Sequence, residues 1–243
     1  MEEAVRISGL RKAYGGLAAV DGIDLSVARG EIFGLLGPNG AGKTTTIECA
    51  LGTRRRDAGI VELLGLDPER DRKRLFERVG VQFQEMGYQD KIRVDELGEL
   101  TTSLYARPAD WRDLFDRLGL GDKRRAAVGE LSGGQRQRLA IALALAPDPE
   151  LVFLDELTTG LDPKARRDVW AIIKGLTAEG RTVFLSSHYM DEVEYLCDRV
   201  AILKAGKIVA QGTPAELMAA NGVQRLEDAF LLFMEREEEG AAC

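Results

Sequence analysis

The amino-acid sequence predicts an α/β fold: a mostly parallel sheet flanked by helices, with an N-terminal antiparallel β region and an inserted helical subdomain. Short apolar runs typical of buried strands alternate with stretches of helical spacing along most of the chain. Segment 87–146 departs from this rhythm, because helical spacing dominates throughout it. Residues 4–36 contain no helical pattern and are expected to form strands. Strands that alternate with helices favour a parallel sheet covered on both faces.

The individual elements follow from apolar runs and the residues that interrupt them. Ile23, Leu25 and Val27 alternate with polar neighbours, which predicts a half-buried strand. A helix is expected from Gly42 to about Leu51, where helical spacing begins after a glycine-rich stretch. The other predicted strands span 31–36, 60–64, 151–154, 182–187, 200–204 and 207–212, and further helices span 163–178 and 189–196.

We expect a single domain over residues 1–243. Residues 1–86 and 147–220 are expected to form its α/β core, and residues 87–146 the helical subdomain. Residues 221–243 are expected to form a C-terminal helix and an acidic tail. In a sheet of this kind ligands bind beyond the carboxyl ends of the strands, so the polar residues there matter most.

Composition excludes several classes of protein. The chain has 243 residues, of which 45% are hydrophobic and 30% charged, as in an ordinary soluble globular protein. Its net charge of -7 argues against a sequence-blind nucleic-acid binder, which usually has a basic face. The first residues, MEEAVRISG, lack the basic and apolar regions of a signal peptide. No stretch reaches the ~18 consecutive apolar residues of a spanning helix.

Three cysteines, Cys49, Cys197 and Cys243, show no paired spacing and no C-x-x-C motif. Neither a disulfide framework nor a zinc site is therefore expected. Cys49 and Cys197 lie in apolar, helix-like contexts and are predicted to be small core residues. A reducing, cytoplasmic setting fits this pattern.

The strongest motif is GPNGAGKT, residues 37–44, which fits G-x-x-x-x-G-K-[ST] between an apolar strand and a helix. Its glycines let backbone N–H groups turn toward phosphate oxygens, and the helix N-terminus adds partial positive charge. Lys43 adds a full charge for the β- and γ-phosphates of ATP, and the Thr44 hydroxyl is a ligand for Mg²⁺. The residues expected to bind the nucleotide here are Gly37, Pro38, Asn39, Gly40, Ala41, Gly42, Lys43, Thr44 and Thr45.

A second motif places two carboxylates after the apolar strand 151–154. Asp155 is placed to hold Mg²⁺, and Glu156, which faces differently, to polarise the attacking water. Alone, the pair would be read as surface acids after a strand. Together with the phosphate-binding loop, it predicts a P-loop NTPase core.

Between the two motifs lies the sequence LSGGQ, residues 131–135, followed by a strongly helical run. Ser132 is a good helix cap, and Gly133 and Gly134 leave backbone amides bare at a positive helix end. A plain helix start is the alternative to a second anion site. LSGGQ ahead of a strand ending in Asp-Glu resembles the signature motif of the ABC ATPases. The resemblance covers almost the whole chain, from Arg6 to about Leu217.

The resemblance implies roles for further residues. Ser132, Gly133, Gly134 and Gln135 would contact ATP held by a second copy. Tyr14 resembles the aromatic residue that stacks on adenine. Gln84, at the end of the predicted strand VGVQFQ, resembles the glutamine that reaches Mg²⁺ and the water, with Gln82 as a rival. Asp162, in Gly-Leu-Asp, resembles the D-loop aspartate, which also lies near nucleotide.

The catalytic set implied by the family is Glu156 as base, His188 as the switch histidine that contacts the γ-phosphate, and Lys43. His188 is the only histidine of the chain and follows the predicted strand 182–187. Most of the family has proline after the catalytic glutamate, whereas this chain has Leu157. Leucine removes a restraint on the turn but no reacting group.

The resemblance also implies partners. Two chains, as a homodimer or with another ABC ATPase, would face each other head to tail when ATP is bound. The transport path would belong to a separate membrane permease, with this chain on the cytoplasmic face of the membrane and coupling through about residues 84–105. The segments GLLGPNGAGKTTTI and SSHYMDEVEYLCDRVAIL resemble the drug-exporter branch typified by daunorubicin-resistance ATPases.

Three other functions remain open at this point. One is an importer subunit, although sugar importers append a regulatory domain after the core. Another is a soluble ABC ATPase of ribosomes or DNA, which would bring a second cassette or long coiled coils. The third is a regulatory module that binds ATP without hydrolysis. The presence of Lys43, Asp155, Glu156 and His188 argues against it.

Overall fold

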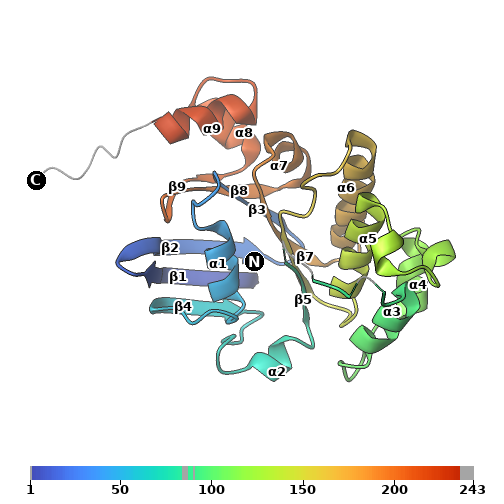
Figure 1. The fold of residues 1–243 in the computed structure, drawn as a ribbon. Coiled ribbons are helices and arrows are strands. Elements are labelled where there is room, and N and C mark those ends of the chain that lie inside the picture. Colours follow the sequence, from blue (N-terminus) through green and yellow to red (C-terminus); the bar gives the residue numbers. More distant parts are fainter. Residues whose placement is uncertain (1, 84–86, 90, 236–243) are drawn as a thin grey trace, which may run out of the picture.

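The computed structural model describes residues 2–83, 87–89 and 91–235, and two sheets organise them (Figure 1). Neighbouring strands of the larger sheet are parallel, apart from its last pair, which is antiparallel. Within the described part of the chain its order is β5 (Val79–Gln82), β6 (Leu151–Asp155), β7 (Thr182–Ser187), β3 (Ile32–Leu36), β8 (Arg199–Lys204) and β9 (Lys207–Gly212).

The smaller sheet is antiparallel and comes mostly from the N-terminal part of the chain. Its order is β2 (Leu17–Ala28), β1 (Glu3–Tyr14) and β4 (Ala58–Leu63). The two sheets confirm the predicted α/β class with an antiparallel N-terminal region. The predicted strand 60–64 begins two residues earlier than expected, because the edge pairing starts at Ala58 opposite Arg11.

The helices are α1 (Lys43–Ala50), α2 (Arg72–Leu75), α3 (Val94–Thr102), α4 (Trp111–Arg117), α5 (Gly133–Ala144), α6 (Pro163–Ala178), α7 (Met190–Leu196), α8 (Pro214–Ala220) and α9 (Leu226–Glu235). Helices α5, α6 and α7 lie on one side of the larger sheet, and α1 lies on its other side, beside the smaller sheet (Figure 1). Several start at residues suited to capping: Ser132 and Thr213 form capping boxes, and Asp162 caps a helix whose first residue is proline.

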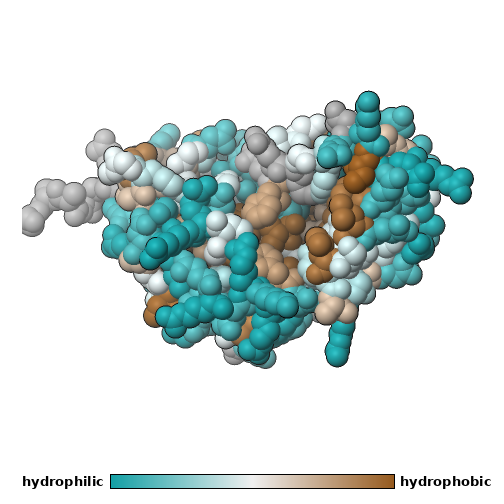
Figure 2. Space-filling view, turned by 60° about the horizontal axis from the view of Figure 1, so that its bottom comes forward, coloured by the Kyte–Doolittle hydropathy of each residue, from teal (hydrophilic) through white to brown (hydrophobic). Residues whose placement is uncertain are grey.

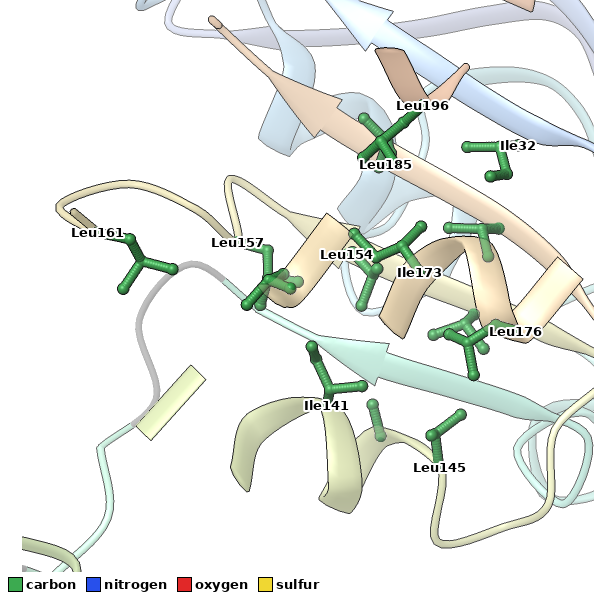
Figure 3. Close-up of a cluster of buried hydrophobic side chains, with 14 of the residues drawn as sticks. Ile32, Ile141, Leu145, Leu154, Leu157, Leu161, Ile173, Leu176, Leu185 and Leu196 are labelled. Atoms are coloured by element: carbon green, nitrogen blue, oxygen red, sulfur yellow. The ribbon is translucent and has the colours of Figure 1, made fainter. Parts of the chain in front are cut away.

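Both faces of the larger sheet are buried, which explains why its central strands are apolar without alternation. On one face Phe33, Phe153 and Phe184 join a core with the smaller sheet and α1. On the other face Leu154 and Leu185 join a core with α5, α6 and α7, part of which Figure 3 shows. The sheet is thus held rigidly between two layers, and its strand ends are fixed relative to one another.

Helix α3 lies within segment 87–146, where helical spacing was expected, and it ends at Thr102. Leu97 is buried, whereas Leu100 and Leu104 are 56% and 71% exposed. Only some of the leucines in and after α3 therefore contribute to the core.

Cys49 and Cys197 are buried free thiols, which confirms their assignment to the core. Burial raises the pKa of Cys49 to about 11, so this thiol stays protonated at neutral pH. None of the helices within the described ranges has the length and apolar character needed to cross a bilayer. The predicted acidic tail, residues 236–243, lies outside the described residues.

Phe184 offers a test of the core between the sheets. Its ring is fully buried between Phe33 and Phe153, with ring centroids 5.5 and 5.0 Å away. We expect Phe184→Ala to lower the free energy of unfolding by about 3–5 kcal/mol, because the cavity is walled by rigid strands. Urea unfolding measures the change, and Leu17→Ala, at a 73% exposed position, is the control expected to shift it by less than about 0.5 kcal/mol. Equal effects of the two substitutions would contradict this packing.

Candidate nucleotide site

The glycine-rich loop 37–42 connects β3 to α1 and adopts the backbone conformation that its sequence predicts. Gly42 caps α1 with a φ of 104°, in the region that only glycine enters readily. A Cβ atom on Gly42 would lie 2.2 Å from the carbonyl oxygen of Ala19 on β2. Glycine is therefore required twice at this position, by its backbone angle and by the neighbouring strand.

A cavity of about 470 Å³ lies over this loop and the carboxyl ends of β6 and β7. Its volume falls in the range usual for small-molecule sites. The structure thus brings the phosphate-binding motif together with two residues predicted as catalytic, Glu156 and His188. The lining residues are Ala19, Asn39, Gly40, Gly42, Lys43, Thr44, Thr45, Glu156, Thr159 and His188.

Lys43 lies at the centre of this arrangement and is 5% exposed. Its ammonium group donates to the carbonyl oxygens of Gly37 at 2.9 Å and Pro38 at 3.3 Å. It also pairs with Oε1 of Glu156 at 3.2 Å. The positive charge is thereby held inside the loop and pointed at the cavity that the loop encloses.

Glu156 connects Lys43 to His188. Its second oxygen, Oε2, is 3.6 Å from Nδ1 of His188. The Glu156 backbone has a φ of 48°, which is uncommon for a residue other than glycine and turns the chain sharply after β6. A carboxylate held beside a histidine at the edge of a cavity can accept a proton from a water molecule there.

Leu157, where most of the family has proline, is 4% exposed and belongs to the core on the helical side of the sheet. Figure 3 shows it among the buried side chains near Leu154 and Ile141. Packing of the Leu157 side chain into this core therefore restrains the turn after Glu156, as a proline ring would at this position.

Asp155, the last residue of β6, is 1% exposed. Burial raises the pKa of its carboxyl group above the usual value, while the hydroxyls of Ser186 and Thr44 favour the charged form. Its Oδ1 accepts a hydrogen bond from Ser186, and among the described residues its Oδ2 accepts none. A carboxylate oxygen left open beside the Thr44 hydroxyl fits the oxygen ligands that Mg²⁺ requires. Gln84, the other predicted ligand, lies outside the described residues.

The signature residues lie elsewhere. Ser132 and Gln135 form a capping box at the start of α5, in which the Gln135 amide donates to Ser132 Oγ at 3.3 Å and the Ser132 amide to Gln135 Oε1 at 2.9 Å. None of the residues from Ser132 to Gln135 lines the cavity over the phosphate loop. A single chain therefore does not bring its two predicted anion sites together.

Two further predicted residues also lie apart from the cavity. Tyr14, 41% exposed, contacts the charged groups of Lys12 and Arg54, 5.5 and 5.4 Å from its ring centroid. The Asp162 carboxylate caps α6 by accepting from the amides of Ala165 at 3.0 Å and Lys164 at 2.9 Å, which lowers its pKa. Neither residue is among those that line the cavity.

Sequence reasoning missed Ala19, Thr159 and Ser186, and it considered Gln82 only as a rival to Gln84. Ala19 and Thr159 line the cavity, and Gln82 and Ser186 contact Asp155. The last two carry a signal that was readable: a polar residue near the end of a strand that is otherwise apolar. The sequence around Ala19 carries no such signal, because the role of this residue depends on the position of β2 beside the loop.

Comparisons with known proteins agree with this geometry. A family model described as ABC transporter matches residues 20–159. A daunorubicin resistance ATP-binding protein of Streptomyces coeruleorubidus is 40% identical over 231 residues, 93% of this chain and 73% of that protein. The chain belongs to the ABC transporter family. It is an ATP-binding subunit of such a transporter, and it is an ATPase.

Other relatives and structures extend the likeness. A fluoroquinolones export ATP-binding protein of Mycobacterium tuberculosis is 42% identical, over 92% of this chain and 75% of that protein. A Nod factor export ATP-binding protein of Ralstonia nicotianae is 42% identical, over 87% of this chain and 68% of that protein. The solved ATP-binding subunit of an ABC transporter shares the fold at a TM-score of 0.85 and 23% identity, covering 95% of this chain and 99% of that one.

Gly42 gives a direct test of the loop. We expect Gly42→Ala to weaken ATP binding at least about tenfold, because the new Cβ atom would push the loop away from β2. Titration with a fluorescent ATP analogue measures the affinity.

The matched control for this test is Gly180→Ala. Gly180 also has a positive φ, of 84°, but a Cβ atom there meets nothing within 4 Å. It carries the same kind of backbone cost without touching the site. ATP affinity reduced equally in both variants would show that general destabilisation, and not the loop, causes the loss.

Proposed function

We propose that this chain powers export through a separate membrane permease by hydrolysing Mg²⁺–ATP in a head-to-tail dimer. The carrying observation is the group formed by Lys43, Glu156 and His188 over the phosphate loop, with the signature residues outside the cavity. Export is proposed because the relatives with about 40% identity are named as resistance or export proteins.

In this proposal each described side chain has one task at the site. Lys43 and the loop amides bind the β- and γ-phosphates, and Glu156 accepts the proton of the attacking water. His188 contacts the γ-phosphate and keeps the Glu156 carboxylate in place. Asp155 and Thr44, with Gln84, hold Mg²⁺, which neutralises phosphate charge when bound.

The dimer follows from the separation of the two anion sites. Gly133 and Gly134 are the first residues of α5, and Gly133 is exposed, so the amides of this helix start face outward. A second chain related by a two-fold axis would place its own α5 over the open cavity. ATP would then join two chains, and loss of the γ-phosphate would loosen them. Tyr14 and Asp162 are proposed to approach nucleotide only in this assembly.

The face that carries α2 and α3 is proposed to receive the permease. A groove of about 670 Å³ lies between α2 and the loop after α3, which includes Ala106 and Arg107. Leu100 on α3 and Leu104 just after it are exposed. Figure 2 shows a face on which apolar side chains gather in a hollow with hydrophilic borders. This docking would place the chain at the cytoplasmic face of the membrane.

Glu156→Gln tests the proposed base. The amide cannot accept a proton, so we expect ATP turnover to fall about 10²–10⁴-fold. ATP binding should persist, because the substitution also removes the carboxylate that now neutralises Lys43. Because hydrolysis is blocked, the ATP-bound dimer should accumulate, and sedimentation velocity would detect it.

Glu227→Gln, at an exposed position on α9, is the control and is expected to turn over ATP as the unchanged chain does. Turnover by Glu156→Gln equal to that of the unchanged chain would eliminate Glu156 as the base. A turnover-deficient variant that stays monomeric with ATP would contradict the dimer instead.

A further inference from the structure

Two buried polar side chains flank Asp155 from the neighbouring strands. Gln82 lies at the end of β5, next to β6, and Ser186 lies near the end of β7, on the other side of β6. In the sheet register Gln82 is opposite Leu154, and Ser186 is opposite Asp155. Each is 2% exposed. The two side chains therefore approach the end of β6 from both sides.

Ser186 contacts both residues that follow the apolar part of β6. Its hydroxyl donates a hydrogen bond to Oδ1 of Asp155. The backbone N–H of Glu156 lies 3.2 Å from the same hydroxyl oxygen and 3.2 Å from the Ser186 carbonyl oxygen. One serine thus orients the Asp155 carboxylate and also fixes the backbone at the start of the turn that carries Glu156.

Gln82 holds the same residue through its backbone. Its side-chain oxygen accepts from the Asp155 N–H at 3.1 Å, and its side-chain nitrogen donates to the carbonyl oxygen of Phe83 at 2.5 Å. The amide group is therefore fixed at both ends. It links the end of β5 to the end of β6 where the two strands separate.

Buried polar groups are unfavourable in an apolar sheet unless they are hydrogen-bonded. Here both side chains hydrogen-bond to Asp155, and each makes one further hydrogen bond, Ser186 with Glu156 and Gln82 with Phe83. The two carboxylate oxygens of Asp155 therefore differ. Oδ1 accepts a hydrogen bond from Ser186, whereas Oδ2, also buried, has no hydrogen-bond partner among the described residues. A buried carboxylate oxygen without a hydrogen-bond partner is suited to bind a cation.

We propose that Gln82 and Ser186 are positioning residues that hold Asp155 with Oδ2 free for the Mg²⁺ of bound ATP, and so set the affinity for the metal. The inference rests on the proposed Mg²⁺–ATP chemistry of the same site. The neighbouring Ser187 has a different role, because its hydroxyl donates to Glu192 and accepts from the Tyr189 amide.

The test measures metal affinity directly, with Mn²⁺ as a paramagnetic stand-in titrated into the protein with ATP and followed by electron paramagnetic resonance. We expect Ser186→Ala to weaken Mn²⁺ binding about 10–100-fold, the usual effect of losing a partner that orients a metal ligand. Ser186→Thr keeps the hydroxyl and should restore affinity to within about threefold. Gln82→Met, which leaves the Asp155 amide unpaired, should weaken it in the same direction.

The control is Thr182→Val, which removes a buried hydroxyl from the other end of the same strand, where it accepts from the Gly30 amide at 3.0 Å. It should cost similar stability without changing metal affinity. ATP binding measured in EDTA should be equal in all variants, because none of these side chains lines the phosphate cavity.

Mn²⁺ affinity of Ser186→Ala within twofold of the unchanged chain would overturn the inference and leave the proposed function intact. Mn²⁺ affinity as weak in Ser186→Thr as in Ser186→Ala would overturn it too, since the hydroxyl would then not determine metal binding. Absence of ATP-dependent Mn²⁺ binding by the unchanged chain would instead contradict the proposed function, and the inference with it.

Discussion

The ion pair between Lys43 and Glu156 joins the two halves of the site. It links the phosphate loop, which follows β3, to the turn after β6, two strands away in the same sheet. Both side chains are buried, and the loop carbonyls that accept hydrogen bonds from the Lys43 ammonium group offset part of the cost of burying its charge. We expect an arriving γ-phosphate to compete with the Glu156 carboxylate for Lys43. Binding of ATP and release of the base are therefore expected to be one event.

The sheet makes that pairing possible. Parallel strands end at the same edge, and two apolar layers hold β3, β6 and β7 in fixed register. In this arrangement the signature residues at the start of α5 do not line the cavity of their own chain. In the proposed head-to-tail dimer, a site divided in this way would respond to the presence of a second chain.

Much of this arrangement could be predicted from the sequence. The glycine spacing of residues 37–44 defines a loop with one workable geometry, and Asp155 and Glu156 follow an apolar run that only a buried strand explains. The sequence did not show that Tyr14 and Asp162 would lie away from the cavity, because their positions depend on packing between elements. Nor did it assign Gln82 or Ser186, since their hydrogen bonds join strands that are distant along the chain. From the sequence, Leu157 meant only the loss of the restraint that proline gives to the turn. The structure shows that its buried side chain restrains the turn by packing in the core.

A mixing experiment tests the central claim, that one active site takes residues from two chains. Lys43→Ala disables the phosphate loop, and Gly133→Asp places a negative charge at an exposed position of the signature, where a new Cβ atom meets only Leu161 at 3.8 Å. Each variant alone should lack ATP turnover. An equal mixture should recover about a quarter of the unchanged chain's activity, because half of the dimers then hold one intact site of two. A mixture as inactive as its components, or full activity of Gly133→Asp alone, would contradict the divided site.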